Sequence, residues 1–190
     1  MQLTLKIRLR PTLVQLTSLR DTVRLYTESF NRVCAIGWKK RRVNGVELHH
    51  ETYYKERELT KLPTQLVCSA RVKATEALAS ARALQKKGKK VTCPKAQFQA
   101  VRYDVRSATI RLDKDFASIA TCSGRQRCAV TIPERYQKYI TCKIASSDLC
   151  RDDKGRFWLH VVVNVVVTVV QPTGEVIGVD LGVSRPAVTS

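Results

Sequence analysis

The chain has 190 residues, 44% of them hydrophobic and 26% charged, which excludes an intrinsically disordered chain and allows one or two small domains. Its 34 Lys and Arg residues against 16 Asp and Glu residues give a formal net charge of +18, which favours nucleic acid as the partner over an anionic membrane surface. The apolar run Val161–Val170 is about half the length of a membrane-spanning helix, and the start of the chain lacks a signal peptide's apolar block, so we expect a cytoplasmic protein without a membrane partner.

The first half of the chain is predicted to be one strand followed by helices. Residues 3–9 alternate between apolar and polar side chains, which predicts a half-buried strand that ends before Pro11. Apolar residues then recur every three or four positions over residues 13–37, which predicts a long helix. The segment KKRRVNGVELHH favours a turn at Asn44-Gly45, and a short helix is expected from Glu51 to Leu59. A second long helix is predicted from Pro63 to Gly88.

The second half of the chain is predicted to be strands. The apolar period changes to two around residues 108–112 and again around 128–132, which indicates strands joined by tight turns. A further hairpin around Asp153-Lys154-Gly155 leads into a strand whose one face is apolar from Phe157 to Val167. One strand, a helical block and several later strands predict an α+β fold, in which helices are inserted into an antiparallel β-barrel or sheet.

The cysteines and histidines give no pattern for a metal site. The seven cysteines are an odd number without C-x-x-C spacing, which favours reduced, buried thiols over disulfides. Only three histidines are present, so a complete metal site is not expected and zinc is not expected in this chain.

The segment GEVIGVDLGVSRPAVTS ends the sequence and places Asp180 within an apolar strand predicted at Val176–Gly182. An ionised carboxylate in such a strand is costly unless it is paired or bound to a metal. Two site chemistries use a strand, an Asp and a glycine turn: ATPases of the actin and chaperone class, and RNase H-like nucleases in which the Asp binds Mg²⁺. The strongly basic residues that come first favour the nuclease. A plain hairpin, with Asp180 bonded by backbone amides, is the structural alternative.

Several segments together resemble a known family. After the leading strand come LPTQLVCSARVKATEALASA, KKGKKVTCPKAQFQAVRYD, a hairpin ending in DDKGRFWLHVVV, and VIGVDLGVSRPAVTS. In this order they resemble the N-terminal half of the TnpB (OrfB) family of transposon-encoded, RNA-guided DNA endonucleases, also described as transposases. The resemblance covers essentially the whole chain. It implies a wedge-type β-barrel from residues 1–10 and 105–172, an inserted helical recognition lobe from 11–104, and the start of a RuvC nuclease domain, which is RNase H-like, at 174–190.

The resemblance implies that Asp180 is the first of three carboxylates that bind Mg²⁺. The second and third carboxylates of the family, and its four-cysteine zinc ribbon, have no counterpart in these 190 residues. Two-metal hydrolysis needs several carboxylates around two ions. We therefore expect a truncated family member that does not cleave DNA by itself. Pro186 departs from the residues more usual after this motif.

Nucleic-acid contacts are predicted at two basic clusters and at two polar segments. The clusters follow the two long helices, and such groups neutralise phosphates without reading sequence. The resemblance adds the start of the second helix and the VRYD segment, and it implies guide RNA and target DNA as partners. The oligomeric state stays open, and the alternatives are a stand-alone basic nucleic-acid-binding protein and an ATPase fragment. The predicted contact residues are Lys39, Lys40, Arg41, Arg42, Thr64, Gln65, Ser69, Lys86, Lys87, Lys89, Lys90, Tyr103, Asp104 and Arg106. The structural alternatives are solvated helix ends for each basic cluster, polar helix surface for Gln65 and Ser69, and a core position for Tyr103.

Overall fold

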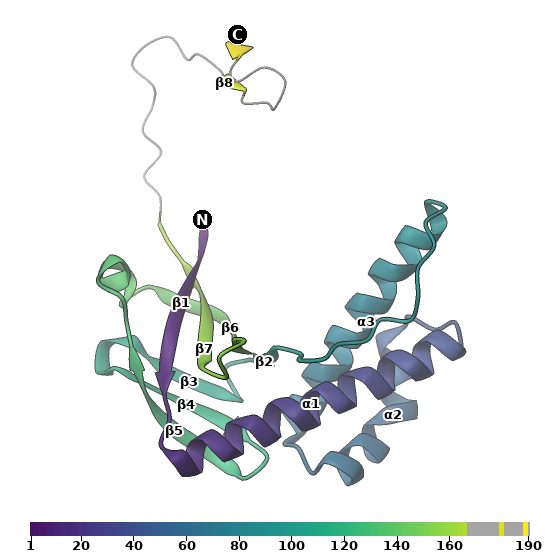
Figure 1. Cartoon of the computed structure of the whole chain (residues 1–190), viewed down its shortest axis with the longest axis horizontal. Helices are drawn as coiled ribbons and strands as arrows, with labels where there is room; N and C mark the ends of the chain where they lie inside the picture. Colours follow the sequence, from purple (N-terminus) through teal and green to yellow (C-terminus); the bar gives the residue numbers. More distant parts are fainter. Residues whose placement is uncertain (167–178, 181–187, 190) are drawn as a thin grey trace.

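A curved antiparallel sheet and a group of helices make up the computed structural model, which describes residues 1–166, 179–180 and 188–189 (Figure 1). The fold is α+β, as predicted, and the seven-stranded sheet within the described residues is nearly closed into a barrel. The elements are β1 (Gln2–Arg10), α1 (Leu13–Lys39), α2 (Gly45–Thr60), α3 (Thr64–Lys86), β2 (Val101–Tyr103), β3 (Ala108–Arg111), the 3₁₀ turn η1 (Leu112–Lys114), β4 (Phe116–Thr121), β5 (Gly124–Thr131), the 3₁₀ helix η2 (Glu134–Tyr139), β6 (Lys143–Arg151), β7 (Phe157–Asn164), β8 (Val179–Asp180) and β9 (Val188–Thr189).

The N-terminal strand lies in the middle of the sheet, whose strand order is β2-β6-β7-β1-β5-β4-β3. On one side β1 pairs antiparallel with β7, from Gln2 opposite Asn164 to Arg8 opposite Trp158. On its other side β1 pairs with β5, where Arg8 lies opposite Thr131. The first strand of the sequence therefore joins two parts of the sheet, both formed by residues 101–164.

The helices α1 and α2 each begin after a residue whose side chain caps the helix. Thr12 and Gln15 form a capping box at the start of α1, because each side chain bonds the other residue's backbone N–H, at 3.4 and 3.0 Å. The prediction for α2 was wrong in its extent, since the helix begins at Gly45 and not near Glu51. The Asn44 side chain accepts a hydrogen bond from the Val46 N–H at 2.8 Å, so Asn44-Gly45 starts a helix and does not form a turn.

The main hydrophobic core lies between the inner face of the sheet and the helices α1 and α3. The inner faces of β1 and β7 are buried, as the alternating patterns predicted. The helices α1 and α3 each contribute the apolar residues of one helix face to the same core. A second, smaller core joins the three helices farther from the sheet. The first core contains Leu5, Ile7, Leu9, Leu19, Val23, Tyr26, Leu66, Ala70, Leu159 and Val161, and the second contains Phe30, Val33, Cys34, Leu48, Ala74 and Leu78.

Three strands were not located from the sequence. The strand β2 has only three residues, β4 has Phe116 and Ile119 as its only large apolar residues, and β6 buries Ser147 on its inner face. The predicted strands near residues 108–112, 128–132 and 157–167 are present as β3, β5 and β7 within the described residues. No helix among the described residues is long and apolar enough to cross a membrane.

The predicted closing strand is described only at Val179 and Asp180, which pair antiparallel with Thr189 and Val188 in a separate two-stranded sheet. The other residues of the predicted strand Val176–Gly182 lie outside the described residues, as do residues 167–172 of the predicted barrel and most of the predicted RuvC segment. The division into wedge, lobe and nuclease domains stays a prediction.

Candidate nucleic-acid interface

The first basic cluster, Lys39–Arg42, forms the corner between α1 and α2, and its four side chains are exposed. Arg41 has a φ of 53°, a left-handed conformation that turns the chain sharply out of α1. Lys40 forms an ion pair with Glu51, and Arg42 lies 3.3 Å from Glu47 and 3.7 Å from Glu51. Lys39 and Arg41 form no ion pair within the described chain, so about half of this cluster's charge is uncompensated.

The second basic cluster, Lys86, Lys87, Lys89 and Lys90, begins at the last residue of α3 and continues just beyond the helix. Gly88 has a φ of 74°, and the Lys89 N–H donates to the Leu84 carbonyl at 3.1 Å, which closes the last turn of the helix. All four lysines are exposed, and among residues 1–166 none of them pairs with a carboxylate. This cluster therefore presents four uncompensated positive charges within five positions of the chain.

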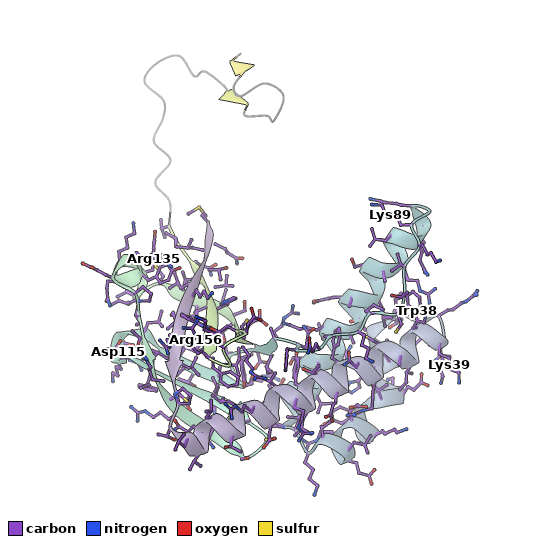
Figure 2. The ribbon with its side chains drawn as sticks, viewed as in Figure 1. Trp38, Lys39, Lys89, Asp115, Arg135 and Arg156 are labelled. Atoms are coloured by element: carbon purple, nitrogen blue, oxygen red, sulfur yellow. The ribbon has the colours of Figure 1, made fainter. Side chains whose placement is uncertain are left out.

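Both clusters lie at the end of the helices that is farthest from the sheet, as the labelled Lys39 and Lys89 show in Figure 2. The second core anchors this end, and the Arg82 guanidinium lies 5.5 Å from the centre of the Trp38 ring between α3 and α1. The Asn31 side chain bonds the N–H and the carbonyl of Ala96, at 2.8 and 2.9 Å, and so ties the returning chain to α1. Both basic clusters are therefore carried by helix ends that are packed against one another.

The predicted contacts at the start of α3 differ in their accessibility. Thr64 is exposed and Gln65 is partly exposed, so both side chains reach the surface. The Ser69 hydroxyl lies inside a network, where it donates to the Arg102 carbonyl at 3.0 Å and lies 3.1 Å from the Tyr26 hydroxyl. Ser69 therefore joins α3 to α1 and β2, and its hydroxyl is already used within the fold.

The prediction that Tyr103 stacks on or reaches a base does not agree with the structure. Tyr103 is only 1% exposed, and its hydroxyl donates to the Ala120 carbonyl at 2.9 Å. Burial holds the pKa of this phenol above its usual range. In β2, Tyr103 lies opposite Ser147 of β6, and its hydroxyl reaches Ala120 of β4, so its ring is enclosed in the core and closed off from a nucleic-acid base.

Asp104 and Arg106 lie on the turn between β2 and β3 and have different roles. The Asp104 carboxylate accepts hydrogen bonds from the Arg106 N–H at 3.0 Å and from the Ser107 N–H and hydroxyl at 2.8 and 2.6 Å. Partial burial alone would raise the pKa of Asp104, but these hydrogen bonds outweigh it and lower the pKa. Asp104 shapes the turn, whereas the exposed Arg106 side chain remains available for a contact.

The outer face of the sheet carries cations that sequence reasoning did not select. The Arg127 guanidinium of β5 lies 3.8 Å from the centre of the Phe116 ring of β4, and the Lys6 ammonium of β1 lies 4.8 Å from the Trp158 ring of β7. The alternating pattern of β1 is enough to place Lys6 on the polar face of the strand. Its contact with Trp158 could not be predicted from the sequence, because it depends on the pairing of β1 with β7. A second basic surface thus lies on the sheet, away from the two clusters.

The described residues do not fit a two-ion magnesium site. No group of three or more His, Cys, Asp or Glu side chains among them is arranged to hold a metal ion. Asp180 is opposite Val188 in the pairing of β8 with β9. The Cys150 sulfur lies 3.6 Å from Nδ1 of His160, but burial raises the pKa of this thiol, which makes it a poor nucleophile.

No protein-family model matches the sequence, and a search of the curated proteins finds no match.

Proposed function

We propose that this protein binds nucleic acid, chiefly through the phosphate backbone. The observation that carries the proposal is the second basic cluster, where four exposed lysines have no acidic partner in the described structure. Like charges held this close repel one another, and a polyanion relieves the repulsion while it releases its own counterions. Lys39 lies at the same end of the helices (Figure 2), and with Arg41, two residues farther along the chain, it adds to this surface.

We further propose that the nucleic acids are a guide RNA and its target DNA, and that the chain acts as the N-terminal part of a TnpB-like, transposon-encoded nuclease. The support is the ordered set of sequence segments together with the order of the elements. Three helices come between β1 and the other strands along the sequence, although β1 is paired with those strands in the sheet. Asp180 would be one Mg²⁺ ligand of that nuclease. Because the described residues do not supply the remaining ligands, the proposal assigns binding, and not cleavage, to these 190 residues.

The test is a titration of the purified chain with a structured RNA and with a DNA duplex of about 20 base pairs, at salt concentrations from about 50 to 200 mM. A variant with Lys86, Lys87, Lys89 and Lys90 changed to Ala is compared with a control in which Lys55, Lys114, Lys138 and Lys143 are changed to Ala. All eight lysines are exposed, and both variants lose the same net charge.

We expect the cluster variant to bind more weakly than the control and to show a shallower dependence of affinity on salt, by about 0.9 in the logarithmic slope for each lost DNA phosphate contact. Equal losses in the two variants would mean that only overall charge matters and that the cluster is not the site. A chain that binds neither RNA nor DNA at low salt would refute the proposal. RNA-guided function further predicts tighter binding to one folded RNA than to a scrambled RNA of equal length, whereas a stand-alone binder does not discriminate.

A further inference from the structure

A cavity of about 400 Å³ lies where the end of β1, the first turns of α1 and the β6–β7 hairpin meet. Its walls are formed by ten residues, and five of these are cationic, whereas none is acidic. The remaining five are apolar residues and a glycine. The cationic residues are Arg8, Arg10, Arg20, Lys154 and Arg156.

The cations reach this cavity from three separate segments. Arg8 and Arg10 share the outer face of β1 because side chains alternate along a strand. Arg20 is exposed on α1, about two turns after its start. Lys154 and Arg156 flank Gly155, whose φ of 74° allows the tight turn between β6 and β7. Such a grouping is invisible in the sequence, because it depends on how β1 pairs with β7.

The hairpin that carries two of these cations is held in one conformation by Asp152. This carboxylate accepts hydrogen bonds from the Arg156 N–H at 2.8 Å, from Arg156 Nε at 2.7 Å and from Trp158 Nε1 at 3.0 Å. Charge-assisted bonds of this kind orient both partners. Arg156 therefore enters the cavity wall from a fixed turn, and less conformational entropy is lost when an anion binds.

The positive charge of the cavity is mostly uncompensated. Arg156 pairs with Asp152, and Arg10 Nε donates to the Thr131 hydroxyl at 3.0 Å. Arg8, Arg20 and Lys154 form no ion pair within residues 1–166. Arginine presents several N–H donors in a planar fork that matches phosphate oxygens. The cavity therefore has the charge and the donors of a phosphate site.

We infer that this cavity, which we term the hairpin pocket, binds phosphodiester groups of a nucleic-acid backbone as a second anchor, distinct from the lysines at the helix ends. This inference rests on the proposed function. Arg20 and Lys39 are 19 residues apart on α1, about 28 Å at 1.5 Å per residue, which approaches one turn of B-DNA, about 34 Å. Figure 2 shows Arg156 in the sheet part of the molecule and Lys39 and Lys89 at the far end of the helices. One duplex or folded RNA is long enough to reach both anchors.

The test uses a pocket variant in which Arg8, Arg20 and Lys154 are changed to Gln. Arg10 and Arg156 are kept, because their hydrogen bonds stabilise the fold. The control variant changes Lys55, Lys114 and Lys138 to Gln, which removes the same charge from exposed positions elsewhere. The probes are a DNA duplex and an RNA duplex of about 20 base pairs, and inorganic phosphate. Circular dichroism and thermal unfolding compare the folding of all variants.

We expect the pocket variant to bind both duplexes at least about tenfold more weakly than the control does, with a shallower salt dependence. In the wild-type chain, either duplex should also protect Arg8 and Arg20 from modification by phenylglyoxal, read by mass spectrometry, whereas millimolar inorganic phosphate should not. The protection measurement needs no variant, so it decides the question even if the pocket variant fails to fold.

The outcomes separate the two proposals. If the pocket variant binds like its control while the four-lysine variant loses affinity, the hairpin pocket is not an anchor and the proposed function stands. If the wild-type chain binds no nucleic acid, both the proposed function and the role of the hairpin pocket are refuted. Protection of Arg8 and Arg20 by inorganic phosphate, at the level that a duplex gives, would make the pocket a site for free phosphate and overturn the inference.

Discussion

Arg32 of α1 binds the carboxylate of Glu56 of α2 through two nitrogens, with Nε 2.9 Å from Oε1 and a terminal nitrogen 2.8 Å from Oε2. Glu56 is only 1% exposed, whereas about a third of the Arg32 side chain remains accessible. The hydrogen bonds that Arg32 donates to the Glu56 carboxylate raise the pKa of Arg32 above its ordinary value. This pair attaches α2 to the helix that links the sheet to the basic helix ends.

Changing Arg32 to Met should destabilise the protein by about 3 kcal/mol, because the buried carboxylate of Glu56 loses its counter-charge. Changing Glu56 to Gln should cost less, because no buried charge is left, and the double change of Arg32 to Met and Glu56 to Leu should recover part of the loss. Urea unfolding measures each free energy. The exposed pair of Arg111 and Asp113 is the control, and its removal should leave the unfolding midpoint nearly unchanged. A loss no larger than in that control would contradict this account of the buried pair.

Tyr103 should behave as a core residue in binding and in stability. Its replacement by Phe should cost about 1 kcal/mol for the hydrogen bond to the Ala120 carbonyl, and its replacement by Ala about 3 to 5 kcal/mol for the lost packing. Affinity for RNA and DNA should be the same in the Phe variant as in the wild type. A Phe variant that keeps its stability but loses affinity would restore Tyr103 as a contact residue.

The turn at Asp104 should contribute stability that depends on pH. Because the folded pKa of Asp104 is below its usual value, its contribution is present above the unfolded carboxyl pKa of about 3.9 and is lost as the pH falls through the folded pKa. We expect Asp104→Asn to be less stable than the wild type near neutral pH, and the difference to shrink in acid. Urea midpoints at about pH 7, 5 and 3 measure this. Asp153→Asn, in the exposed hairpin turn, is the control, and a difference that stays constant with pH would contradict the prediction.

The regular patterns of the sequence were sufficient to locate the larger elements. Strict alternation in residues 3–9 and the three-and-four spacing in 13–37 correspond to β1 and α1 within a few residues. Each of these elements buries one face, so the positions of its apolar residues in the sequence show which side chains lie in the core. By contrast, β6 has the sequence KIASSDLCR, in which buried Ser147 and Leu149 do not form an apolar stripe. Such a strand is identified by its partners, β2 and β7.

The candidate site was predictable only where its cations are consecutive in the chain. Lys39–Arg42 and Lys86–Lys90 are visible as short basic runs, and the structure leaves them exposed. The hairpin pocket was not predictable, because Arg8 and Lys154 are separated by most of the sequence and come together only through the pairing of β1 with β7. The sequence left Tyr103 open between a base contact and a core position, because a strand of three residues gives too short a pattern to separate a core face from a surface face.

The central place of β1 in the sheet imposes an order on assembly during synthesis. Its two neighbours, β5 and β7, are translated more than a hundred residues after it, whereas α1, α2 and α3 follow it directly. The helices have local partners on the emerging chain, but β1 has no neighbouring strand until β5, which ends at Thr131, has left the ribosome, and its second neighbour, β7, ends at Asn164. During that interval its exposed edges are open to other nascent chains, and the cationic residues Lys6, Arg8 and Arg10 act as gatekeepers against such pairing.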